Sequence, residues 1–221
     1  MNIKGKDRFY WDRTYRKEVP SLSSMVLMKN KNGVVIATDS RLTKGKEYRD
    51  DFKKVFMIPE KDIMYGVVGF YGSNDENILK EIHQSLKTMT LEKAVHEITK
   101  MAKGFALYQQ TNIYIVHKGQ VTIIDLIRDN VFCGNVPENH VGVISIGSHS
   151  FMQNYYLPED LTDLTLESLK EKAFELVQNE CVIDRFIHQT NPNFVETIGG
   201  DIMVVSRTKE GLIEEDLFQN S

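Results

Sequence analysis

The sequence predicts an α+β fold in which two antiparallel sheets pack face to face and helices cover the outer faces, a four-layer αββα sandwich. Strands and helices come in blocks: strands, two helices, strands, one helix, strands. A parallel βαβ fold would alternate single strands with single helices. The strand blocks also contain tight-turn signals between apolar runs, which is typical of antiparallel hairpins.

The first strand block contains two hairpins. Residues 24–41 give an apolar run, a turn at Asn32–Gly33 and a β-branched run, and both turn residues tolerate positive φ. Residues 53–58 and 62–72 form the next pair, with a bend at 59–61. The second of these runs is apolar on both faces and is therefore expected to be a buried central strand. Its glycines suggest close backbone approach; they are Gly66, Gly69 and Gly72.

The helices are predicted by apolar residues at helical spacing. One helix is expected from about Asn74 to Met89, and a second follows the N-cap Thr90 and continues to about Ala106. A third long helix begins after the cap Thr165. The later strands are expected at residues 112–119, 120–127, 131–134, 140–148, 201–208 and 212–218.

Composition limits the class of protein. The chain has 221 residues, with 41% hydrophobic and 26% charged, which fits one globular domain. No apolar run is long enough for a membrane helix, and the first residues lack the apolar stretch of a secretory signal. Cys133 and Cys181 are far apart and favour neither a zinc site nor a disulfide framework, so we expect a cytoplasmic protein.

Charge and motifs exclude several functions. Residues 1–22 carry six basic and three acidic side chains, so the rest of a chain of net charge −4 is acidic, which argues against nucleic-acid binding. His96–Glu97 is followed by Lys100 where a second zinc ligand would stand. Residues 146–150, IGSHS, match a GxSxG elbow only loosely, and no phosphate loop or dinucleotide fingerprint is present. We therefore expect no cofactor and no metal.

An ordered set of motifs carries a family resemblance. These are GVVIATDSRLTKG, FKKVF, GVVGFYG, IGSHS, DLTLE and GGDIMVV, and the resemblance covers about Ser23 to Ile213. In this order they resemble a proteasome β-type subunit and its relatives, the bacterial ATP-dependent proteasome-like peptidases. The resemblance implies an N-terminal-nucleophile hydrolase, with residues 1–22 as a leader and 23–221 as the domain.

The resemblance identifies Ser23 as the nucleophile. The family's nucleophile lies sixteen residues before the Asp of the DSR motif, here Asp39, whereas Ser24 is one residue out of register. Once a leader is removed, the free α-amine can accept the proton of its own hydroxyl, because its pKa is about 7.7–8.0. The alternative is that Ser23 merely opens a strand.

Further catalytic residues follow from the same motifs. Lys54 matches the family's catalytic lysine and Asp39 its carboxylate partner, while Gly69 matches the glycine whose N–H stabilises the oxyanion. Without the resemblance, Asp39 is a turn residue, Lys54 a solvated charge and Gly69 a plain strand glycine. Ser148 matches a serine that hydrogen-bonds the terminal amine, although it could instead be a strand-end cap.

The family's second aspartate is ambiguous in this chain. Counting forward from LTLE reaches Asp184, which we favour, whereas counting back from Gly199–Gly200 reaches Val195. By the resemblance, the segment FIHQTNPNFVETIGG (residues 186–200) is about eleven residues longer than is usual in the family. Two further departures are Leu22, where the family commonly has Gly before the scissile bond, and Ile198, where it often has Ser.

Substrate-binding residues are also implied. Thr43 and Gly45 match positions that pair with the substrate backbone as an added strand. By position, the side chains expected to line the specificity pocket are Leu42, Phe52, Phe56, Val67 and Tyr71. They favour a hydrophobic P1 residue, and core packing explains them equally well.

The expected function is thus a proteasome-like endopeptidase acting on unfolded protein or peptides within homo-oligomeric stacked rings, served by an ATP-driven unfoldase. One alternative is a non-catalytic ring subunit or scaffold that retains its leader. Another is an amidase of the same fold that acts on a small amide.

Overall fold

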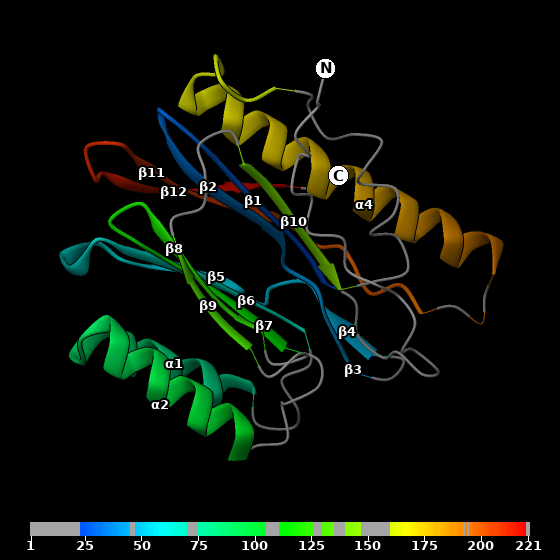
Figure 1. Ribbon diagram of the computed structural model, residues 1–221. Helices are drawn as coiled ribbons and strands as arrows, with labels where there is room; N and C mark the ends of the chain where they lie inside the picture. The colour runs from blue at the N-terminus through cyan, green and yellow to red at the C-terminus, as the bar shows by residue number, and fades with distance from the viewer. Residues whose placement is uncertain are drawn as a thin grey trace, which may run out of the picture.

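The computed structural model describes residues 23–44, 47–69, 75–104, 111–125, 130–134, 140–146, 160–191, 193 and 195–219. In this part of the chain the strands form two five-stranded sheets and one two-stranded sheet, all antiparallel. Figure 1 shows the larger sheets lying one over the other, with helices on the outside of each. This confirms the α+β class.

The first sheet has the order β10-β1-β2-β11-β12. Its strands are β1 (Ser23–Asn30), β2 (Gly33–Asp39), β10 (His140–Ile146), β11 (Ile202–Thr208) and β12 (Ile213–Phe218). The register pairs Met25 with Thr38 and Ile202 with Asp39. The start of β1, the end of β2 and the start of β11 therefore lie side by side at the same end of the sheet.

The second sheet follows chain order, β5-β6-β7-β8-β9. Its strands are β5 (Val55–Ile58), β6 (Ile63–Gly69), β7 (Thr111–His117), β8 (Gln120–Asp125) and β9 (Asn130–Gly134). A short 3-10 turn, η1 (Pro59–Lys61), joins β5 to β6. It stands where the sequence predicted a bend. A small hairpin of β3 (Leu42–Lys44) and β4 (Glu47–Arg49) lies between β2 and β5 in the chain.

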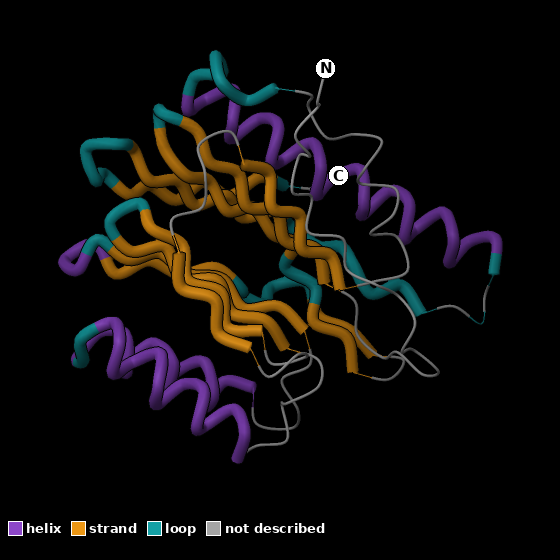
Figure 2. Tube along the Cα trace, in the orientation of Figure 1, coloured by secondary structure: helices purple, strands orange, loops and turns teal. Residues whose placement is uncertain are grey.

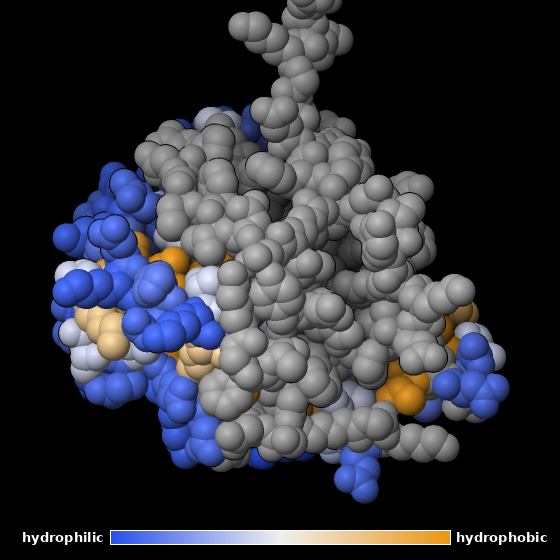
Figure 3. All heavy atoms as spheres, turned by 60° about the horizontal axis from the view of Figure 1, so that its bottom comes forward, coloured by the Kyte–Doolittle hydropathy of each residue, from blue (hydrophilic) through white to orange (hydrophobic). Residues whose placement is uncertain are grey.

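The helices are α1 (Asp75–Thr88), α2 (Leu91–Gly104) and α4 (Leu166–Thr190). Thr165 caps α4 as expected, because its hydroxyl accepts a hydrogen bond from the Ser168 N–H at 3.1 Å. In Figure 2, α1 and α2 lie beneath one sheet and α4 lies above the other. In the view turned toward the α1 and α2 side, the described atoms that can be seen are mainly hydrophilic, with smaller apolar groups among them (Figure 3).

Three apolar clusters hold these parts together. One joins α4 to the first sheet, a second contains Met25, Ile36 and Met64 and so joins the two sheets, and a third joins the second sheet to α1 and α2. Burial of each large apolar side chain contributes about 1.5–3 kcal/mol, so these clusters are the main stabilising contribution. Gly66 shows how closely the sheets approach, since a Cβ there would lie 2.5 Å from the Met25 Cε.

The predicted hairpin of β1 and β2 forms, but its turn lies one residue before the expected Asn32–Gly33. The loop between β1 and β2 consists of Lys31 and Asn32, and the non-glycine residues with positive φ in the described chain are Asp62 and Lys118. Gly33 instead opens β2, where a Cβ would lie 2.3 Å from the Arg207 carbonyl oxygen. Glycine is therefore required here by the close approach of β11.

The hairpin β3–β4 was not predicted as strands, because Glu47–Arg49 are all exposed and two of the three are charged. Several expectations lie outside the described residues: the leader 1–22, Gly45, residues 70–72, the end of the second helix beyond Gly104, and Ser148. In the described part, no helix is long and apolar enough to span a membrane.

Candidate active site

Ser23, Asp39 and Lys54 meet where three strands begin or end. Ser23 opens β1, Asp39 closes β2, and Lys54 comes directly before β5 of the facing sheet. The Lys54 ammonium lies 2.8 Å from Asp39 Oδ1 and donates a hydrogen bond to Ser23 Oγ at 3.2 Å. Lys54 and Asp39 are completely buried and Ser23 is 3% exposed.

The Asp39 carboxylate is held by four donors. Oδ1 accepts from the Ser24 N–H at 2.9 Å as well as from Lys54, while Oδ2 accepts from the N–H groups of Arg41 and Gly199, each at 3.2 Å. A buried charge is tolerated only when its lone pairs are satisfied in this way. The arrangement suits an ionised carboxylate that fixes the position of the ammonium beside Ser23.

Gly69 is the last residue of β6, a strand that contacts Lys54. The N–H of Val67 donates to the Lys54 carbonyl oxygen at 2.9 Å, and Gly69 follows two residues later. Its φ of 118° lies in the region that favours glycine. The sequence identified this residue by motif, and its backbone conformation gives a physical reason for glycine at the position.

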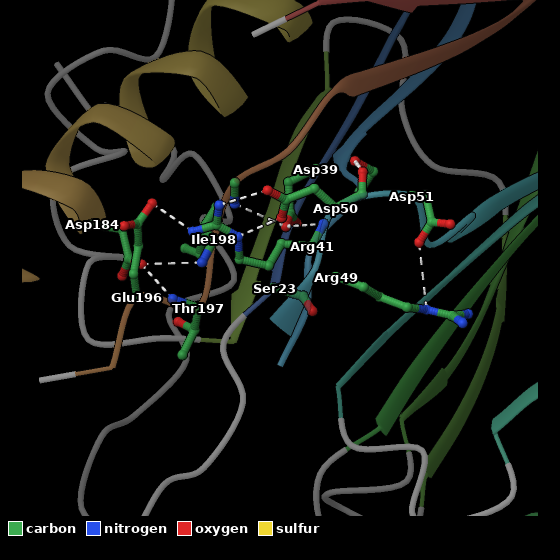
Figure 4. Close-up of polar contacts among 12 residues, drawn as sticks. Ser23, Asp39, Arg41, Arg49, Asp50, Asp51, Asp184, Glu196, Thr197 and Ile198 are labelled. Carbon is green, nitrogen blue, oxygen red and sulfur yellow. Dashed lines mark hydrogen bonds and ion pairs between the residues drawn. The ribbon is translucent and has the colours of Figure 1, made fainter. Parts of the chain in front are cut away.

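Asp184 acts on a neighbouring segment. It is completely buried on α4, and its Oδ2 accepts hydrogen bonds from the N–H groups of Thr197 at 2.6 Å and Ile198 at 3.0 Å. We call residues 196–199 the strap. The strap links Asp184 to Asp39, because the next amide, that of Gly199, donates to Asp39 (Figure 4). Asp184 therefore reaches the Ser23 region through the backbone.

Arg41 was missed by the sequence reasoning, although it belongs to the DSR motif. Its guanidinium binds both oxygens of Asp50, at 2.6 and 2.8 Å, and its Nη1 lies 2.5 Å from Glu196 Oε1 (Figure 4). It also stacks on the Tyr48 ring, 4.0 Å from the centroid. Burial alone would lower the pKa of Arg41, but the carboxylates of Asp50 and Glu196 outweigh burial and raise the pKa above its usual value.

Cys181 lies close to the site, but its thiol is not suited to act as a nucleophile. It lies on α4, 1% exposed, and burial followed by the negative charge of Asp39 raises the pKa of its thiol well above the usual value. A thiol that stays protonated is a poor nucleophile. Cys181 is therefore a packing residue beside the site.

The expected substrate-binding residues divide into two groups. Phe52 and Val67 are buried in the cluster between the second sheet and α1 and α2, and Leu42 and Phe56 pack against it half-buried. Core packing thus accounts for Phe52 and Val67 at least. Thr43 lies in β3, paired with Tyr48, whereas Gly45 and Tyr71 are outside the described residues, as is Ser148.

Among the residues that the structure describes, no group of three or more His, Cys, Asp or Glu side chains could hold a metal ion. The groups that meet at this site are a serine hydroxyl, a lysine ammonium and a carboxylate.

Comparison with known families places the chain in a family. The family model described as "Proteasome subunit" matches residues 23–186, from the first residue of β1 to the last part of α4. The match includes Ser23, Asp39, Lys54, Gly69 and Asp184 and ends before the strap. No curated protein matches the chain.

Proposed function

Because this chain belongs to the proteasome subunit family, we propose that it is an N-terminal-nucleophile endopeptidase in which Ser23 attacks peptide bonds once residues 1–22 have been removed. One observation carries the proposal: the buried Lys54 ammonium lies within hydrogen-bond distance of both Ser23 Oγ and Asp39 Oδ1. That the family match begins at Ser23 supports the same domain boundary.

The mechanism starts with the α-amine that leader removal exposes. With a pKa of about 7.7–8.0, this amine is partly unprotonated at neutral pH and accepts the proton of Ser23 Oγ. The oxygen then bonds to the substrate carbonyl carbon, the carbon–nitrogen bond breaks, and the proton passes to the leaving amine. Water hydrolyses the ester and regenerates Ser23.

The other residues support these two steps. The Lys54 cation, held by Asp39, stabilises negative charge on Oγ, and the Gly69 N–H stabilises the oxyanion. Ser148 hydrogen-bonds the α-amine, and Asp184 acts through the strap. Thr43 and Gly45 pair with the substrate backbone, beside a pocket that includes Leu42 and Tyr71.

The assembly follows from the family. We place the active sites inside homo-oligomeric stacked rings, in a cytoplasmic protein that takes unfolded protein or peptides, with delivery by an ATP-driven unfoldase. The two sheets with helices outside them would be the four-layer αββα sandwich of such a subunit.

Intact mass and N-terminal sequencing of the untagged protein test the proposal. The wild type should lose residues 1–22 and start at Ser23, and Ser23→Ala should keep them. Ser24→Ala is the matched control, since the Ser24 hydroxyl has no hydrogen-bond partner among the described residues. It should be processed like the wild type.

A second candidate is a non-catalytic ring subunit that keeps its leader. Leu22 and Ile198 favour it, because a bulky residue before the scissile bond hinders self-cleavage and Ile198 has no hydroxyl. A full-length wild-type mass under all conditions, in a protein that still forms large assemblies, would support this candidate. A small processed protein that cleaves only small amides would instead indicate an amidase.

A further inference from the structure

The strap is clamped at three successive points. The Glu196 carboxylate pairs with Arg41, the Thr197 and Ile198 amides bind Asp184, and the Gly199 amide binds Asp39. The Gly199 carbonyl also accepts the Arg41 N–H at 2.9 Å. The strap therefore connects the end of α4 with the carboxylate that holds Lys54.

Arg41 fits tightly against the strap. Its side chain is 7% exposed, and a Cβ added at Gly199 would lie 2.6 Å from the guanidinium carbon. The adjacent Gly200 has φ +73°, and a Cβ there would lie 2.5 Å from Ser40 Oγ and 2.9 Å from the Asp50 carbonyl oxygen. These contacts leave the chain little freedom to shift at this point.

The opposite side of the guanidinium is fixed as well. Asp50 binds it with two parallel hydrogen bonds, a geometry that sets orientation as well as distance. Ser40, next to Arg41, donates its hydroxyl proton to the Asp50 carbonyl oxygen. Asp50 thus anchors Arg41, and Arg41 anchors Glu196.

We propose that Arg41 and Glu196 are positioning residues, whose ion pair holds the strap so that the Gly199 amide orients the Asp39 carboxylate under Lys54. This inference rests on the proposed function for its catalytic consequence. Neither residue touches Ser23 in a described contact; they act through Asp39. If the strap moved, Asp39 Oδ2 would lose one of its two donors and the carboxylate could rotate away from Lys54.

The test compares Glu196→Gln and Arg41→Lys with a matched control. Glu196→Gln keeps an oxygen for Arg41 but loses the charge, and Arg41→Lys keeps the charge but loses the planar fork. The control is Arg207→Lys. Arg207 is also buried and binds both oxygens of one aspartate, Asp62, but it lies at the far end of β11, paired with Val34.

Two measurements are made on each full-chain protein: kcat and KM against pH with a short fluorogenic peptide, and hydrogen exchange of the amides of residues 197–199. We expect both site variants to lower kcat by about 10- to 100-fold with KM little changed, because the reacting groups are misplaced. We also expect a displaced pH–rate midpoint and faster exchange in the strap. Arg207→Lys should change neither.

The outcomes separate the inference from the proposed function. Unchanged pH profiles and strap exchange in both site variants would overturn the inference, even if those variants were less stable, and leave the function intact. A wild type with no peptidase activity and no leader loss would refute the function, and strap exchange would then still decide whether Arg41 and Glu196 hold the Gly199 amide. If Glu196→Gln fails to fold, Arg41→Lys supplies the same comparison.

Discussion

At the scale of single residues, burial determines how Lys54 and Asp39 behave. Both side chains are completely removed from solvent, where an unpaired charge costs several kcal/mol. Four donors around Asp39 and the contact with Ser23 Oγ offset that cost. The pair is therefore stable only as a unit.

Lys54→Met should destabilise the fold by about 3–5 kcal/mol, because Asp39 would be left as a buried charge without its cation. Urea unfolding of the full chain measures this change. The neighbouring Lys53→Met is the control: Lys53 is 41% exposed and pairs with Glu215 at 2.6 Å, so its loss should cost no more than about 1 kcal/mol. If the two variants lost the same free energy of unfolding, burial would not be the reason for the stabilising effect of Lys54.

His117 gives a pH dependence that can be isolated. Burial, and then the nearby Lys118, lower the pKa of His117, with smaller effects from Asp62, Arg207 and Lys61. The unfolded chain thus binds a proton at higher pH than the folded chain does. The contribution of neutral His117 to stability is present above about pH 6.5 and is lost as the pH falls through the lower folded-state pKa.

His117→Gln should remove this contribution. The decrease in Tm between about pH 7.5 and about pH 5.5 should be smaller than in the wild type, whereas above about pH 7.5 the two curves should run parallel. Thermal unfolding across this range is the measurement. An undiminished decrease in the variant would show that other groups carry the acid sensitivity.

Sequence reasoning found some of these residues and missed others for a physical reason. The family resemblance implied the roles of Ser23, Asp39 and Lys54, and the structure brings their side chains together. The contact between Arg41 and Glu196 joins segments that are far apart in the sequence. No local pattern marks such a pair.

At the scale of elements, turn chemistry and apolar periodicity predicted most strands and helices. The bounds of α1, the start of α2 after Thr90 and the start of α4 after its cap Thr165 agree with expectation, because their apolar faces repeat at helical spacing. The hairpin β3–β4 could not be predicted, since exposed charges at Glu47–Arg49 have no apolar period. Gly33 was assigned to the wrong role because its constraint comes from β11, a strand far away in the sequence.

Gly33→Ala should therefore destabilise the first sheet by about 1–3 kcal/mol, as overpacking does, because the added methyl would meet the Arg207 backbone. Denaturant unfolding measures the loss. Lys31→Ala in the adjacent loop is the control, since Lys31 makes a 3.4 Å ion pair with Asp163 at the surface, which contributes little. If Gly33→Ala left the free energy of unfolding unchanged, β2 and β11 would be able to move apart without a loss of stability.

At the scale of the whole molecule, the two sheets and α4 together define the site. The first sheet supplies Ser23 and Asp39, the segment leading into the second supplies Lys54, and α4 supplies Asp184, which holds the strap. The apolar cluster between the sheets fixes their separation and hence the distance from Lys54 Nζ to Ser23 Oγ. All of these groups belong to one chain.

Leader removal, if it occurs as proposed, should then be an event within one subunit. Co-expression of the wild type with a mass-tagged Ser23→Ala chain tests this: in mixed assemblies the wild-type chains should lose residues 1–22 while the Ser23→Ala chains keep them, at every ratio of the two. The physical reason is that the groups able to activate the bond before Ser23 lie beside that residue in its own chain, buried from neighbours. Loss of the leader from Ser23→Ala chains in proportion to the wild type present would instead require cleavage between subunits, and would mean that the buried Ser23–Lys54 contact is not the arrangement that cuts the chain.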